Sequence, residues 1–77
     1  MDIVRVFGNN VRKYRQTRGL SQEKLAEISG LHRTYISAIE RFHRSISLEN
    51  VQRIAEALQV DTYQLFVEET DELHPEK

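Results

Sequence analysis

Apolar side chains recur along most of this chain at intervals of three and four residues, and no stretch alternates with polar residues in steps of two. The longer spacing is the period of an α-helix, and steps of two are the period of a strand. The pattern therefore predicts an all-α fold. We expect five helices, over residues 3–18, 22–29, 33–41 and 48–58 and in a short last segment that carries Leu65 and Phe66.

Residues that favour helix ends stand where these helices are expected to begin and end. Gly19 can end the first helix, because glycine readily adopts the positive φ of a helix C-terminus. Ser21 and Ser47 suit the N-caps of the second and fourth helices, and Asp61 or Thr62 suits that of the last. The predicted buried stripes of the first and fourth helices are Val4, Phe7, Val11 and Tyr14, and Leu48, Val51, Ile54, Ala55 and Leu58.

The segment 22–41 predicts two short helices folded tightly around a turn. Their expected buried stripes are Leu25, Ala26 and Ile28 in the first helix and Ile36 and Ile39 in the second. Ala26 is small enough for two helix backbones to approach closely near the turn. Gly30 can take the positive φ that the turn needs. This is the pattern of a helix-turn-helix, and it indicates DNA binding.

The outward face of the second of these helices carries short side chains with an arginine near each end. Since Ile36 and Ile39 face inward, helical geometry turns Thr34, Ser37, Ala38 and Arg41 outward, with Arg33 on the flank of the exposed start. Such a row can enter a major groove about 12 Å wide and meet base edges and phosphates there. An ordinary solvated helix more often carries Glu and Lys.

At these residues the chain resembles a known family. The segments that carry the resemblance are Leu20-Ser21-Gln22-Glu23-Lys24-Leu25-Ala26, Gly30, Arg33-Thr34-Tyr35-Ile36-Ser37, Ile39-Glu40-Arg41 and Ser45-Ile46-Ser47-Leu48-Glu49. They are similar to the Xre-like branch of the phage repressor and Cro-like DNA-binding domains, over roughly residues 5–66. Within that branch the chain looks most like the small controller proteins of restriction-modification systems. The resemblance implies a compact five-helix repressor-like domain.

The resemblance also implies which residues contact DNA. The expected base-reading residues are Arg33, Thr34, Tyr35, Ser37 and Ala38, and the expected phosphate-binding residues are Gln22, Arg15, Arg41, His43, Arg44 and Ser45. Each has a plainer alternative: an exposed helix start without a partner, small residues beside another surface, a polar filler or a solvated side chain. Tyr35 could instead cover the core with its ring. Arg15 is expected first to form an ion pair with Glu40, and a phosphate contact can coexist with that pair.

Phe42 departs from the pattern of the family, which usually places Gly or Asn directly after Glu-Arg or Glu-Asn. A left-handed backbone at Phe42 would cost about 1–2 kcal/mol. We therefore expect the loop to follow another path, which puts the backbone-contacting roles of His43, Arg44 and Ser45 in question.

Composition changes this picture only where charge is concerned. The net charge is −1, but residues 1–44 hold nine Lys or Arg against four acids, whereas residues 45–77 hold two against eight. This asymmetry suggests one face for phosphates and another for a different contact.

The chain has no Cys, and His32, His43 and His74 lack metal-ligand spacing, so we expect neither a metal nor a cofactor. No catalytic constellation and no membrane-spanning segment stands out, so we expect a cytoplasmic protein that is not an enzyme.

The short recognition helix suggests that two copies of the chain act together. We expect a single domain over residues 1–77, with its core at 3–67 and an acidic tail at 68–77. The predicted function is transcriptional regulation: a homodimer binds a pseudo-palindromic operator and regulates its own promoter, and restriction-modification genes are a further target. The expected partners are operator DNA, a second copy and RNA polymerase, with no membrane.

The predicted dimer interface is Tyr63, Leu65, Phe66 and Val67, with closure of the monomer core as the alternative. A protein-binding module, such as a helix-turn-helix antitoxin, is the alternative function.

Overall fold

The computed structural model describes residues 1–68; the segment 69–77, which holds most of the predicted acidic tail, lies outside the described residues. The described chain is all-helical, with α1 (Ile3–Thr17), α2 (Gln22–Ser29), α3 (Arg33–Glu40), α4 (Leu48–Leu58) and η1 (Thr62–Phe66). The predicted all-α class is confirmed. The last element corrects the prediction of five α-helices, because it is a single short 3₁₀ segment.

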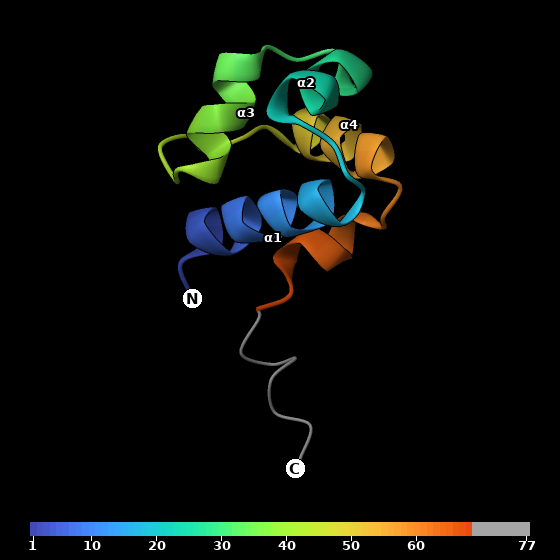
Figure 1. Cartoon of the computed structure of the whole chain (residues 1–77). Helices are drawn as coiled ribbons and strands as arrows, with labels where there is room; N and C mark the ends of the chain where they lie inside the picture. Colours follow the sequence, from blue (N-terminus) through green and yellow to red (C-terminus); the bar gives the residue numbers. More distant parts are fainter. Residues whose placement is uncertain (69–77) are drawn as a thin grey trace.

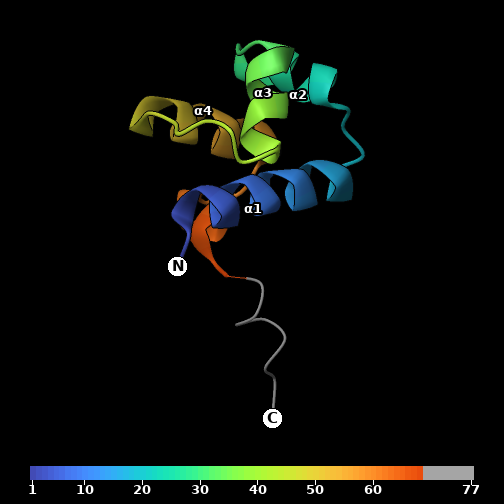
Figure 2. The same ribbon diagram turned by 90° about the vertical axis from the view of Figure 1, so that its left-hand side faces the viewer.

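The helix α1 lies between the remaining helices and η1 (Figures 1 and 2). It packs against α3 and α4 on one side and against η1 on the other, while α2 packs against α3 and α4. The helix-turn-helix formed by α2 and α3 therefore rests on a base made of α1, α4 and η1.

The predicted caps explain why the helices begin where they do. The hydroxyl oxygens of Ser21 and Ser47 accept hydrogen bonds from the backbone N–H groups of Lys24, at 2.9 Å, and Asn50, at 3.2 Å. Each bond satisfies one amide that has no partner within its helix. Asp61, rather than Thr62, is the N-cap of η1.

The C-terminal end of α4 is held by the end of α1. Gln59 caps α4 in the left-handed region, with φ 61°. The guanidinium of Arg18 donates to the carbonyl oxygens of Leu58, at 2.7 Å, and Gln59, at 2.9 Å. These carbonyls are among those that a helix C-terminus leaves without partners. Arg18 therefore connects the C-terminal ends of α1 and α4 through hydrogen bonds.

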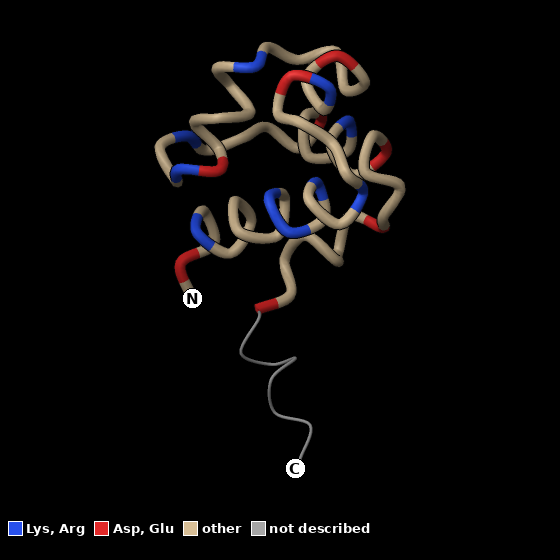
Figure 3. Tube along the Cα trace, in the orientation of Figure 1, with Lys and Arg blue, Asp and Glu red and all other residues tan. Residues whose placement is uncertain are grey.

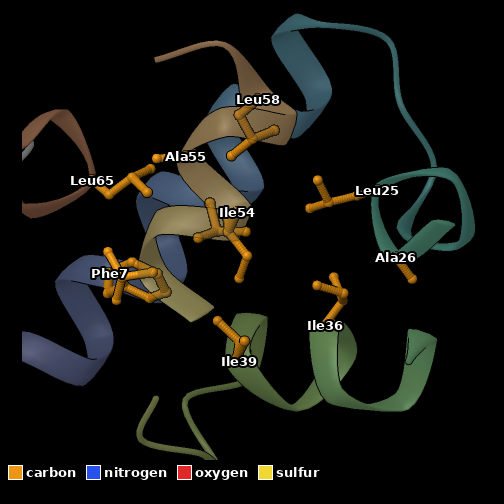
Figure 4. Close-up of a cluster of buried hydrophobic side chains, with 11 residues drawn as sticks. Phe7, Leu25, Ala26, Ile36, Ile39, Ile54, Ala55, Leu58 and Leu65 are labelled. Atoms are coloured by element: carbon orange, nitrogen blue, oxygen red, sulfur yellow. The ribbon is translucent and has the colours of Figure 1, made fainter. Parts of the chain in front are cut away.

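The core draws on every element (Figure 4). Its buried hydrophobic residues are Phe7, Val11, Leu25, Ala26, Ile36, Ile39, Val51, Ile54, Ala55, Leu58 and Leu65. Two predicted core positions are wrong. Ile28 is 49% exposed and Leu48 is 84% exposed.

The geometry of the two helices explains both corrections. Around α2, Ser29 lies about 40° from Leu25 whereas Ile28 lies about 60° to the other side. Ser29 is therefore buried in place of Ile28, and its hydroxyl donates to the carbonyl of Leu25 at 2.7 Å. Leu48 is the first residue of α4 and lines an open apolar groove instead of the core.

The segment η1 closes the core of a single chain. Leu65 is fully buried, so its prediction as a dimer-interface residue is wrong. It belongs to the core of the single chain, which was the predicted alternative. The amide of Asn10, itself buried, donates to the carbonyls of Leu65 at 3.0 Å and Val67 at 2.8 Å. The ring of Phe66 lies 5.3 Å from that of Phe7, centroid to centroid. Asn10 therefore fixes η1 against α1.

Candidate nucleic-acid interface

A tight turn at Gly30 sets the angle between α2 and α3. Gly30 has φ 75°, and the backbone N–H of Leu31 donates to the carbonyl of Ala26 at 2.9 Å. This bond and the left-handed glycine form the common glycine-based end of a helix. His32 then adopts an extended conformation, and α3 begins at Arg33. The predicted helix-turn-helix geometry is thus present at the expected residues.

The helix α3 separates a buried face from a polar outward face. Ile36 and Ile39 are buried, whereas Arg33 and Thr34 are exposed and Ser37 is half-buried. Among residues 1–68, the side chains of Arg33, Thr34 and Ser37 form no hydrogen bond with the rest of the chain. Their donors and acceptors are available to a ligand. Ala38, the remaining small residue predicted on this face, is also half-buried.

A buried carboxylate joins the three helices behind this face. Nε and Nη2 of Arg15 donate to the two carboxylate oxygens of Glu40, at 2.6 and 3.0 Å, and Nη1 donates to the carbonyl of Leu20 at 2.8 Å. The exposed fractions of the two side chains are 12% for Arg15 and 4% for Glu40. The predicted ion pair is confirmed. The phosphate contact of Arg15 stays a prediction.

Gln22 belongs to the same network. Its Nε2 donates to Oε1 of Glu40 at 3.1 Å. One N–H of that amide remains for another acceptor, because a primary amide has two donor hydrogens. The network therefore orients Gln22 at the first turn of α2, where a helix N-terminus favours an anion.

Tyr35 lies between the core and the outward face of α3. Its ring is half-buried beneath the guanidinium of Arg44, which lies 4.9 Å from the ring centroid. Its hydroxyl accepts a hydrogen bond from the amide of Asn50 at 3.2 Å. The sequence pattern did not indicate this role for Asn50, because an Asn in the first turn of a helix is unremarkable. Both contacts hold Tyr35 beside the other predicted base-reading residues.

The loop that follows α3 keeps the conformation that Phe42 was expected to avoid. Phe42 has φ 66°, so the prediction of another path is wrong. The backbone N–H of His43 donates to the carbonyl of Ala38 at 2.8 Å, which closes the end of α3. The predicted phosphate-binding residues in this region, Arg41, His43, Arg44 and Ser45, are all exposed.

Basic and acidic residues are unevenly distributed over the described chain, although Lys24 on α2, Arg53 on α4 and Glu40 on α3 lie among residues of the opposite sign (Figure 3). Basic positions lie along α1, at the start of α3 and in the loop after α3, whereas acidic positions gather on α2 and α4. Glu40, the acid nearest to that loop in sequence, has both carboxylate oxygens engaged by Arg15 and Gln22. The outward face of α3 is therefore bordered by basic groups.

Residues 11–65 match the helix-turn-helix family model. The chain belongs to the helix-turn-helix family. The model spans α2, the turn at Gly30 and α3, together with most of the elements that support them. The proteins of this family that resemble the chain are transcriptional regulators, a class without enzymatic activity.

Relatives of this helix-turn-helix protein include restriction-modification controllers. It is 53% identical over 58 residues to control protein C.SmaI of Serratia marcescens, and the matched segment covers 75% of this chain and 69% of that protein. It is 52% identical over 56 residues to control protein C.BamHI of Bacillus amyloliquefaciens, with 71% and 69% covered. The crystal structure of the restriction-modification controller protein C.AhdI from Aeromonas hydrophila superposes with a TM-score of 0.80 at 43% identity, with 82% of this chain and 96% of that chain covered. The predicted resemblance to controllers is confirmed.

Among residues 1–68, no three His, Asp or Glu side chains gather in a way that could hold a metal ion. None of the helices described has the length and apolar character needed to cross a membrane.

Proposed function

We propose that this helix-turn-helix protein binds a pseudo-palindromic operator as a homodimer and regulates transcription from it, including that of its own gene and of restriction-modification genes. The observation that carries the proposal is the outward face of α3. Its unpaired polar side chains project from a helix whose other side is fixed by Ile36, Ile39 and the buried Arg15–Glu40 pair. Rigid support of this kind is what base reading requires, because the readers must keep their register on the duplex.

The length of α3 supports two copies on one operator. Eight residues at 1.5 Å each give a helix of about 12 Å, which reaches only a few base pairs. A symmetric partner that reads a second half-site one helical turn away completes the specificity.

An apolar groove beside the loop after α3 is the surface that we assign to the second copy. The residues that line it are Ile3, Val4, Phe7, Arg44, Ser45, Ile46, Leu48, Val51 and Phe66. Leu48 and Ile3 are 84% and 54% exposed, so covering them would remove apolar surface from water. Because Arg44 and Ser45 border the groove, a copy docked there would lie beside the DNA. Phe66 retains its proposed interface role, and Tyr63, at 66% exposure, and Val67 remain candidates.

Selection of duplexes from a random pool with the purified protein tests the proposal. We expect a palindrome whose half-sites are about 10 base pairs apart, centre to centre. Its affinity should exceed that for random DNA by about 10³-fold or more and should fall steeply with salt. The DNA upstream of the protein's own gene should compete for binding. Equal binding to every duplex would contradict sequence-specific regulation.

A further inference from the structure

The loop after α3 is held by a contact with α1 that none of the predicted DNA-binding residues makes. The ring of Phe42 packs on Gly8 so closely that a Cβ atom added to Gly8 would lie 2.9 Å from a ring carbon and 2.4 Å from the carbonyl oxygen of Ile39. Only glycine fits at this position. Phe42 is therefore placed by the surface of α1 despite its φ of 66°.

Arg5, one turn before Gly8 in α1, lies over the face of the Phe42 ring. Its guanidinium carbon lies 4.5 Å from the centroid of the Phe42 ring, which is the geometry of a cation–π interaction. Arg5 is exposed, and within residues 1–68 its guanidinium forms no ion pair. Asp2 accepts a hydrogen bond from the backbone N–H of Arg5, so that carboxylate serves the helix start. The charge of Arg5 is thus held in place without being neutralised.

The position of this charge matters because of its neighbours. Phe42 stands between Arg41 and His43, so the ring brings a cation of α1 to the edge of the loop that follows the recognition helix. Figure 3 shows basic positions of early α1 and of this loop at the same end of the molecule. The carboxylate of Glu40 is engaged by Arg15 and Gln22 and forms no ion pair with Arg5.

We propose that Arg5 is a further DNA-contacting residue that binds a backbone phosphate, and that Phe42 is the residue that positions it. The inference rests on the proposed function and extends it from the helix-turn-helix to α1. Within residues 1–68 the guanidinium of Arg5 forms no hydrogen bond or ion pair beside its contact with the Phe42 ring, so its N–H groups can donate to phosphate oxygens. A preformed orientation reduces the rotamer entropy that a free Arg side chain would lose on binding.

The salt dependence of DNA binding tests the role of Arg5. For the duplex selected above, Arg5→Gln should make the slope of log K against log[salt] less steep by about 0.9 per half-site. Affinity in 0.1 M salt should then fall about eightfold per half-site, on selected and random duplexes alike. Arg5→Lys should recover most of the slope, because it keeps the charge.

Arg53→Gln is the matched control, since it removes the same charge from an exposed position of α4 beside Glu49 and Glu56. It should leave the slope unchanged. If Arg5→Gln lowers only the unfolding midpoint and leaves the slope unchanged, Arg5 merely covers the ring and the inference is wrong. If the unaltered protein binds no duplex, the proposed function and this inference fail together.

A double-mutant comparison tests the positioning role of Phe42. Phe42→Gly keeps a residue that tolerates φ 66° but removes the ring. In that background Arg5→Gln should reduce affinity by less than in the unaltered protein, because Arg5 is no longer held beside the loop. An equal loss in both backgrounds would overturn the role of Phe42, whatever the result for Arg5.

Discussion

At the scale of single residues, the decisive feature is Glu40, whose carboxylate connects helices that are distant in sequence. It is 6% exposed and accepts hydrogen bonds from Arg15 of α1 and Gln22 of α2. A buried carboxylate with several donors is costly to leave without them, because its desolvation is then uncompensated. The same residue thus contributes to stability and to the orientation of the proposed DNA-binding groups.

Arg15→Ala should lower the free energy of unfolding by about 3 kcal/mol, since it leaves a buried carboxylate without its cation. It should also weaken DNA binding, because α3 loses its attachment to α1. Urea denaturation measures the first effect. The control is Lys24→Ala, which removes an exposed ion pair with Glu27 at 3.4 Å and should cost less than about 0.5 kcal/mol. An unchanged stability with weaker binding would make Arg15 a phosphate contact alone.

Arg33→Ala should reduce affinity selectively. An arginine that donates to both acceptors of a guanine contributes about 1–3 kcal/mol per half-site only where that base is present. Titration of the selected and the random duplexes should therefore show a loss on the first and little change on the second. Arg41→Ala, at a proposed phosphate contact, should weaken both equally. A uniform loss for Arg33→Ala would assign Arg33 to the backbone as well.

At the scale of secondary-structure elements, local signals in the sequence predicted most of the fold. Ser21, Ser47 and Gly30 act within a few residues of their own positions, so their effects can be read from sequence alone. The contacts of Arg5 with Phe42 and of Asn10 with η1 depend on residues 37 and 55 or more positions away. Those contacts require the packed structure, which is why neither was predicted.

Replacing Gly8 by alanine should change the free energy of unfolding in the direction opposite to that expected from helix propensity, because α1 and α3 lie close together at this residue. An alanine in a helix interior normally stabilises by about 1 kcal/mol relative to glycine. At Gly8 the added methyl group meets the Ile39 carbonyl and the Phe42 ring, so Gly8→Ala should lower the free energy of unfolding by about 1–3 kcal/mol. Asn9→Ala, at the adjacent exposed position, should instead raise it slightly. A stabilised Gly8→Ala variant in urea denaturation would show that α1 and α3 can separate freely.

At the scale of the whole molecule, the proposed dimer requires exposed apolar residues that a second copy can cover. Leu48→Asp should yield monomers, because a carboxylate would face its symmetry mate across an isologous contact. The fold should survive, since Leu48 is 84% exposed in the single chain. Sedimentation analysis measures the assembly state. Ile28→Asp, which changes an exposed apolar residue on α2 in the same way, should remain dimeric. The reverse result would move the interface to the surface of α2 and α4.

The separate roles of the two faces of α3 have a consequence for how regulators of this kind diversify. Arg33, Thr34 and Ser37 are bound to nothing else in the described chain, whereas Ile36 and Ile39 in the same two turns are buried. Under the proposed function, substitutions at the outward positions should therefore change the preferred DNA sequence with little effect on folding. A duplicated gene could acquire a new operator by a few such steps, each of which leaves a folded protein on which selection can act.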